Sequence, residues 1–200
     1  MKAVSLRSVN FLFLCAVFVL SSGCAQSTSL NKGDKAPLFT ARGSMAGKDF
    51  DFSMKKALAK GPVVLYFYPS AYTQGCDLEA HTFSEMKDEF EKANATIIGV
   101  SADDLSRLHD FSADPDYCAG NFPVASDPKG EIAAQYGLKI SKGQPGAKDV
   151  RGREIGHGFL PRVTFVIAKS GKIEAVFSSQ KDGISPDEHV KKSLEIVKEL

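Results

Sequence analysis

The chain has 200 residues, 43% of them hydrophobic and 24% charged, which fits one ordinary globular domain once any targeting segment is set aside. Its 25 basic and 24 acidic side chains nearly cancel, so the charge gives no reason to expect a nucleic acid or an acidic surface as partner. Of the four cysteines, Cys76 and Cys118 lie in the body of the chain. They can form a structural disulfide, half of a metal site or a redox couple, and a domain of this length does not need the first.

The first two dozen residues have the pattern of an export signal. Lys2 and Arg7 precede an apolar run, residues 11–20, which gives way to small residues. A basic start, an apolar stretch of about 7–15 residues and small residues after it are typical of a secretory signal. The run is shorter than the roughly 20 apolar residues of a transmembrane helix. We therefore expect residues 1–24 to be a signal peptide and the protein to reach the periplasm or the cell envelope.

Two cleavage sites fit this segment. Leu20–Cys24 resembles a bacterial lipoprotein box, in which Cys24 is lipidated and becomes the mature N-terminus, although Ser21 stands where leucine is expected. Gly23 and Ala25 supply the small residues for ordinary cleavage after Ala25. We favour lipidation, which would anchor the protein to a membrane through Cys24 and leave residues 25–33 as a polar tether.

Residues 34–200 begin with alternating strands and helices. The expected elements are a strand at 63–67, a helix over 76–93, a strand at 96–100 and a helix around 105–111. Both strands are continuous apolar runs, as in strands buried on two faces. The first helix carries Phe83, Met86 and Phe90 on one stripe. This order predicts a parallel α/β arrangement with right-handed crossovers.

The second half of the domain has a different order. Strands at 163–168 and 173–177 are separated by four residues, which predicts an antiparallel hairpin. Ser185, Pro186 and Glu188 then open the last helix with a capping box. A βαβ half followed by a ββα half predicts the α/β thioredoxin fold, a central mixed sheet flanked by helices. Between the halves, residues 141–158 are polar and rich in glycine, which indicates a long surface loop.

Cys76 stands where the first buried strand gives way to a helix. A cysteine in the first turn of a helix lies near unpaired backbone N–H groups and the positive end of the helix dipole, which favour the thiolate and lower its pKa below about 8.5. Thr73 can place a hydroxyl beside the sulfur, and Pro69 ends the strand and can shield the site from water. A buried, unreactive cysteine is the alternative that position alone leaves open.

The spacing of these residues carries a family resemblance. Pro69, Thr73 and Cys76 match the peroxiredoxin active-site motif Pro-x-x-x-Thr-x-x-Cys. The wider string from Tyr68 to Glu79 resembles the Q-type branch, also called bacterioferritin-comigratory proteins. The segment that begins at Arg162 is similar to the one that carries the essential arginine of that family. The resemblance covers residues 34–200.

The resemblance implies roles for individual residues. Cys76 would be the thiolate that attacks a hydroperoxide and becomes a sulfenic acid. Arg162 would stabilise the thiolate and the charge on the leaving oxygen. Thr73 and the Cys76 backbone N–H would bind peroxide oxygens, and Glu79 would orient Arg162 or else be an exposed carboxylate. Two further arginines, Arg151 and Arg153, match no motif position and are interpreted as solvated.

The second cysteine of many Q-type proteins, five residues after the first, is here His81. A lone helical histidine without further ligands does not predict a metal site, and no cofactor is expected. Other members of the branch carry a resolving cysteine at the position of Cys118, so the resemblance implies a disulfide with Cys76. The alternative is a buried free thiol and reduction of the sulfenate by an external thiol.

Two other functions compete with a hydroperoxide reductase. A thioredoxin-fold thiol-disulfide oxidoreductase uses Cys-x-x-Cys, but Thr73 occupies the partner position. A copper-binding assembly factor uses Cys-x-x-x-Cys and a histidine, but Tyr72 stands in that place. The resemblance implies a thioredoxin-like dithiol as reductant and a monomer, since the Q-type branch is often monomeric.

Overall fold

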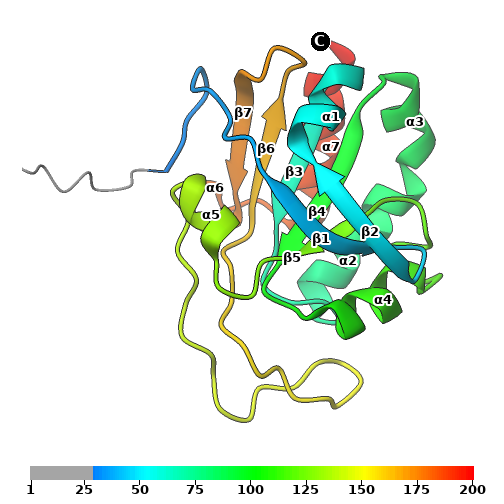
Figure 1. Cartoon of the computed structure of the whole chain (residues 1–200), viewed down its shortest axis with the longest axis vertical. Helices are drawn as coiled ribbons and strands as arrows, with labels where there is room; N and C mark the ends of the chain where they lie inside the picture. Colours follow the sequence, from blue (N-terminus) through cyan, green and yellow to red (C-terminus); the bar gives the residue numbers. More distant parts are fainter. Residues whose placement is uncertain (1–28) are drawn as a thin grey trace, which may run out of the picture.

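The computed structural model describes residues 29–200, which form a seven-stranded sheet with helices on both faces (Figure 1). The sheet order is β2-β1-β5-β4-β3-β6-β7. The elements in chain order are β1 (Thr40–Met45), β2 (Lys48–Ser53), α1 (Met54–Lys60), β3 (Val63–Phe67), α2 (Gln74–Glu85), α3 (Lys87–Lys92), β4 (Thr96–Ser101), α4 (Leu105–Ala113), β5 (Val124–Ser126), α5 (Glu131–Gln135), β6 (Val163–Ile167), β7 (Ile173–Ser178), α6 (Ser179–Asp182) and α7 (Pro186–Lys198). The expected α/β class and mixed sheet are confirmed.

The centre of the sheet is β3, which runs parallel to β4 and antiparallel to β6. Because β3 and β4 are parallel, their carboxyl ends meet at one edge of the sheet. The loop of residues 68–73 leaves that edge toward α2, and Asp103 follows β4 beside it. The start of β6 lies at the same edge, since Val163 pairs with Phe67. The register therefore brings Arg162, next to Val163, close to the start of α2.

Two hydrophobic clusters cover the two faces of the sheet. Alternate residues of β3 enter different clusters: Val63, Leu65 and Phe67 pack with α1 and α5, whereas Val64 and Tyr66 pack with α2, α3, α4 and α7. All five side chains are buried. Each fully buried large apolar side chain contributes about 1.5–3 kcal/mol, so the continuous apolar run of β3 holds both layers in place.

One continuous helix was expected over residues 76–93, but the structure has two helices, α2 and α3. The expectation of a single helix is therefore wrong. The break lies at Met86, whose backbone (φ −93°, ψ 6°) leaves the helical region. Acidic residues in the first turn of α3 favour a new helix start there. The bend keeps Phe83 and Phe90 in one cluster, with ring centroids 5.6 Å apart.

The predicted tether, residues 25–33, is only partly separate from the domain. Leu30 packs against the hydrophobic cluster on the α1 side, and the N–H of Gly33 donates to the carbonyl of Ile173 at 2.8 Å. The residues from 30 onward are thus part of the fold. The predicted signal peptide, both predicted cleavage sites and Cys24 lie outside the described residues. Within residues 29–200 no helix is both long and apolar enough to cross a membrane.

Candidate active site

Cys76 lies in the first turn of α2, where the loop from β3 enters the helix. Its side chain is 1% exposed, and its backbone N–H donates to the carbonyl of Thr73 at 2.8 Å. This N–H was expected to bind a peroxide oxygen, but in the structure it is bonded within the helix turn. The sulfur receives a hydrogen bond from Nη2 of Arg162 at 3.2 Å.

A buried carboxylate holds Arg162 beside the sulfur. Arg162 also donates through Nη1 to Glu79, which is fully buried one turn after Cys76 on α2. The interpretation of Glu79 as an exposed carboxylate is therefore wrong. Burial raises the pKa of Glu79 to about 7, against the lowering effect of Arg162. Although burial lowers the pKa of Arg162, Glu79 and Cys76 raise it above its ordinary value, so the guanidinium stays charged.

Gly75 leaves the space that the guanidinium occupies. A Cβ at Gly75 would lie 3.0 Å from Nη2 of Arg162 and 3.5 Å from Cγ of Pro186. A contact of 3.0 Å is tighter than ordinary van der Waals contact between such atoms. Any side chain at this position would push Arg162 away from Cys76, which gives a steric reason for glycine immediately before the cysteine.

The loop before α2 is fixed by its own hydrogen bonds. Oγ1 of Thr73 donates to the carbonyl of Ser70 at 2.8 Å, and Thr73 is the N-cap residue of α2. Pro69 is half-buried two residues after β3. The structure thus places Pro69, Thr73 and Cys76 on one continuous turn, with Arg162 and Glu79 against its helical end.

The pKa of Cys76 differs from the sequence-based expectation. Burial raises the pKa of this thiol above its ordinary value, whereas Arg162, the Thr73 side chain and the Ser70 backbone lower it. The expected net lowering is not found, because removal of the sulfur from water outweighs the groups that favour the thiolate. Of those groups Arg162 lowers the pKa of Cys76 the most, so the thiolate population depends chiefly on this side chain.

Cys118 is also buried, and its thiol is free, as is that of Cys76. Burial, followed by the charges of Asp114 and Asp77, raises the pKa of Cys118 well above its ordinary value. Cys118 lies in a turn after α4, and the next two residues have left-handed backbones, Ala119 at φ 50° and Gly120 at φ 70°. Both thiols contribute to one hydrophobic cluster, but no bond joins them.

Sequence reasoning missed a buried acid beside this site. Asp103 accepts hydrogen bonds from Oγ of Ser70 at 2.7 Å, the N–H of Ala71 at 2.8 Å and Nε2 of His157 at 2.8 Å. Burial raises the pKa of Asp103, but hydrogen bonds led by that from His157 lower it below its ordinary value. The position of Asp103 in the sequence could have revealed it, because Asp103 follows β4 at the sheet edge where the Cys76 loop leaves β3.

The interpretation of Arg151 as solvated is also wrong. Its guanidinium carbon lies 3.2 Å from the centroid of the Tyr72 ring, and the side chain donates to Asp149. Arg153, by contrast, has a side chain that is 62% exposed. No feature of residues 141–158 distinguished the two arginines, because the fold of the loop decides which of them faces the domain.

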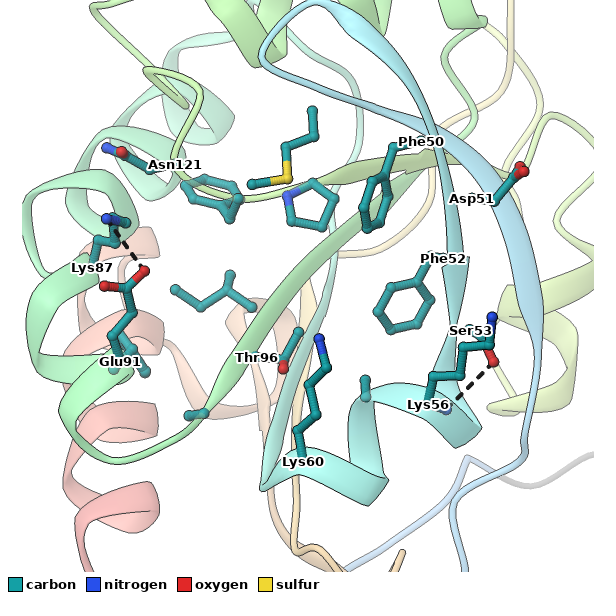
Figure 2. Close-up of a pocket in the computed structure, with 17 residues that line it drawn as sticks. Phe50, Asp51, Phe52, Ser53, Lys56, Lys60, Lys87, Glu91, Thr96 and Asn121 are labelled. Atoms are coloured by element: carbon teal, nitrogen blue, oxygen red, sulfur yellow. Dashed lines mark hydrogen bonds and ion pairs between the residues drawn. The ribbon is translucent and has the colours of Figure 1, made fainter.

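His81 and the cavity in Figure 2 lie apart from this arrangement. His81 is exposed and contacts Asp116 and Glu85. Among residues 29–200 no cluster of three histidine, cysteine or acidic side chains could hold a metal ion. A cavity of about 430 Å³ lies between β2, α1 and α3, with phenylalanines Phe50 and Phe52 on one wall and Lys60 reaching toward it (Figure 2). Its lining includes neither cysteine nor Arg162.

Comparisons with known proteins identify the family of the chain. The AhpC/TSA family matches residues 32–176. The chain is 28% identical to the chloroplastic peroxiredoxin Q of Populus jackii over 196 residues. This alignment covers 96% of this chain and 81% of the relative. The crystal structure of peroxidoxin BcpB from Mycobacterium tuberculosis superimposes with a TM-score of 0.68 at 29% identity, covering 86% of this chain and 98% of that one.

The bacterioferritin comigratory protein of Xanthomonas campestris is a further structural relative. Its TM-score is 0.59 at 25% identity, with 78% of this chain and 89% of that one covered. The family match spans well over half of the chain, and the solved relatives share its thioredoxin fold. The chain therefore belongs to the AhpC/TSA family and is a peroxiredoxin, a thiol peroxidase with Q-type relatives.

Proposed function

We propose that this peroxiredoxin reduces hydrogen peroxide and organic hydroperoxides with Cys76 as its nucleophile. The observation that carries the proposal is the hydrogen bond of 3.2 Å from Arg162 to the Cys76 sulfur at the start of α2. A fixed guanidinium stabilises negative charge as it moves from the thiolate to the leaving oxygen. The activity toward alkyl peroxides named for the Xanthomonas relative supports organic hydroperoxides as substrates.

In the first step the Cys76 thiolate attacks the terminal peroxide oxygen. The S–O bond forms as the O–O bond breaks, the sulfur is oxidised to sulfenic acid, and the leaving alkoxide or hydroxide takes up a proton as alcohol or water. Arg162 is positioned for both charges because Glu79 binds its other nitrogen. Thr73 and Pro69 complete the pocket as positioning residues.

In the second step the Cys118 thiol attacks the sulfenic acid. A Cys76–Cys118 disulfide forms and water leaves, and an external thioredoxin-like dithiol then reduces the disulfide by thiol exchange. Both cysteines belong to one cluster, which supports this pairing. Each is buried in its own surroundings, so the start of α2 and the turn at Cys118 must open before the sulfurs meet.

Peroxide consumption by the purified, reduced protein tests the proposal. We expect Cys76→Ser to abolish consumption. Cys118→Ser, the matched control, should consume one equivalent of peroxide and then stop until a small thiol is supplied. Peptide mapping after one equivalent should find the Cys76–Cys118 disulfide in the wild type. A Cys76→Ser variant that keeps most of the rate would contradict the proposal, and thiol–disulfide exchange without peroxide consumption would support an oxidoreductase instead.

We further propose that the protein is exported and anchored by lipidated Cys24, and that the domain is monomeric. The basic, apolar and small residues of positions 1–24 support export, and the lipoprotein-like box ending at Cys24 supports lipidation. Mass spectrometry of the mature protein measures the lipid and the cleavage site. A mature chain that starts at Gln26 without a lipid would indicate ordinary signal-peptidase cleavage, and sedimentation equilibrium tests the monomer.

A further inference from the structure

The loop of residues 141–158, drawn in yellow in Figure 1, forms no helix or strand, yet it is bound to the active-site turn at two places. Near one end Nε2 of His157 donates to Asp103 at 2.8 Å, and Asp103 also accepts from Ser70 and Ala71. In the middle of the loop the N–H of Val150 donates to the carbonyl of Tyr72 at 2.9 Å. Tyr72 is next to Thr73, so both contacts act on the turn that leads into Cys76.

Asp149 holds together the part of the loop that lies on Tyr72. Its carboxylate accepts from the backbone N–H groups of Arg151 and Arg153, each at 2.9 Å, and from the Arg151 side chain. It also accepts from Arg107 of α4 at 2.7 Å. Although burial raises the pKa of Asp149, hydrogen bonds from Arg153 and Arg151 lower it. The carboxylate thus ties the loop to α4 and fixes Arg151 over the Tyr72 ring.

Tyr72 connects this loop to the segment of the second cysteine. Its ring is buried and meets the ring of Tyr117 edge-on, with centroids 5.3 Å apart. Tyr117 immediately precedes Cys118. The Tyr72 backbone has φ 59°, a left-handed conformation that a tyrosine adopts only when its surroundings hold it. The guanidinium of Arg151 and the N–H of Val150 contribute to holding it in that conformation.

We propose that residues 147–157 act as a clamp, with Arg151 as its positioning residue. The clamp holds the turn from Ser70 to Thr73 in the arrangement that reacts with peroxide, and it must release Tyr72 before Cys76 can bond to Cys118. This inference rests on the proposed two-cysteine function. It predicts that a weaker clamp has opposite effects on the two steps: slower reaction with peroxide and faster disulfide formation.

Two neighbouring arginines give a matched pair of variants. Arg151→Ala removes the contact with the Tyr72 ring, the side-chain bonds to Asp149 and a contact with Asp110. Arg153→Ala removes only an exposed contact with Asp110 and keeps the backbone bond to Asp149. Arg151→Lys keeps the charge but loses the planar fork, so its effect should be intermediate.

The test measures two rate constants in each variant by rapid quenching. Loss of peroxide gives the first, and the decay of sulfenic acid trapped by dimedone gives the second. The ratio of the second rate constant to the first should rise about tenfold in Arg151→Ala relative to Arg153→Ala, within the range expected for loss of a partly exposed cation–π contact. A rise of less than threefold, or equal slowing of both steps, would overturn the clamp. Absence of trapped sulfenic acid in Cys118→Ser would instead overturn the proposed function.

Discussion

Cys76 and Cys118 are buried in the same hydrophobic cluster, but they lie among opposite charges. Cys76 has Arg162 at 3.2 Å from its sulfur, and that cation is held by Glu79. Cys118 has only the acids Asp114 and Asp77 as charged influences. Burial raises the pKa of both thiols, and only at Cys76 is it opposed by a cation.

This difference in neighbouring charge explains how one hydrophobic cluster can contain a reactive thiol and an unreactive one. Desolvation makes each sulfur a poor nucleophile, since the thiolate is the reactive form. A fixed guanidinium offsets part of that cost at Cys76. Cys118 has no such cation, so under the proposed mechanism it reacts only after its turn opens to solvent. The proposed order of the chemistry, Cys76 first and Cys118 second, is thus consistent with where the charge lies.

Among the variants that test this comparison, Arg162→Ala should have the largest effect, because it makes the surroundings of Cys76 resemble those of Cys118. Arg162→Ala leaves a buried thiol without a cation, and loss of a charge-stabilising donor costs about 3–4 kcal/mol, or 10²–10³ in kcat/KM. The pKa of Cys76 should rise, because Arg162 is the largest influence that lowers it. Peroxide competition kinetics measure the rate, and alkylation against pH measures the pKa. Arg42→Ala, at an exposed arginine, is the control.

A variant with the wild-type rate and thiol pKa would show that the reactivity of Cys76 does not come from Arg162. In that case the comparison between the two cysteines would fail, since the charge beside each sulfur would not decide its chemistry.

Thr73→Val removes the hydroxyl beside Cys76 and preserves the shape of the side chain. It also leaves the carbonyl of Ser70 without the donor that now lies at 2.8 Å. One hydrogen bond is worth about 1 kcal/mol net, so kcat/KM should fall about tenfold while stability falls by only about 1 kcal/mol. Measuring peroxide kinetics and urea unfolding on the same samples separates the two effects. Loss of stability with unchanged kinetics would limit Thr73 to a structural role.

Gly75→Ala tests the cation by displacement rather than removal. The new Cβ would lie 3.0 Å from Nη2 of Arg162, so the guanidinium must move by a few tenths of an ångström. We expect a fall of about threefold in kcat/KM, since a small misplacement weakens a charged contact without abolishing it. Gly183→Ala is not a suitable control because that glycine has φ 67°, whereas Gly156→Ala meets open space. Equal kinetics in Gly75→Ala and Gly156→Ala would contradict the steric argument.

The sequence predicted the parts of this site that depend on chain order. The apolar run at 63–67 and the cysteine that follows it required a strand, a turn and a helix start, and the structure has them. The contact between Arg162 and Cys76, 86 positions apart, followed only from family resemblance. Its physical cause is the antiparallel pairing of Phe67 with Val163, which periodicity within each strand does not reveal.

Other parts were missed because their local signals are weak. The strand β5 has three residues and is defined by its partners β4 and β1 rather than by its own pattern. The hairpin of β1 and β2 begins with a polar, glycine-containing segment. Arg151 and Arg153 have the same chemistry in the same loop, so only the folded loop distinguishes the one that lies on Tyr72. Tertiary contacts decided each of these cases.

A buried histidine close enough to Arg162 to be affected by its charge predicts a pH effect on stability. His189 of α7 shares hydrogen bonds with Thr164 and Ser179, each at 2.9 Å. Burial lowers its pKa from 6.5 to about 4, with a further lowering by Arg162 that Asp182 and Glu188 oppose. The unfolded chain thus binds a proton between pH 6.5 and 4 that the folded protein does not, so stability falls as pH falls through this window. The loss is at most about 3 kcal/mol.

His189→Gln isolates that proton, because glutamine can bond to Thr164 and Ser179 but does not titrate. Urea unfolding followed by circular dichroism between pH 7 and pH 4 gives the free energy of unfolding of each protein. The variant should be less stable than the wild type at pH 7, because glutamine fits the site less well than the neutral histidine. Its free energy of unfolding should fall less steeply toward pH 4. The difference in slope should approach one proton, about 1.4 kcal/mol per pH unit. Parallel curves would mean that His189 has the same pKa in the folded and unfolded chains, and that its burial does not produce the fall in stability.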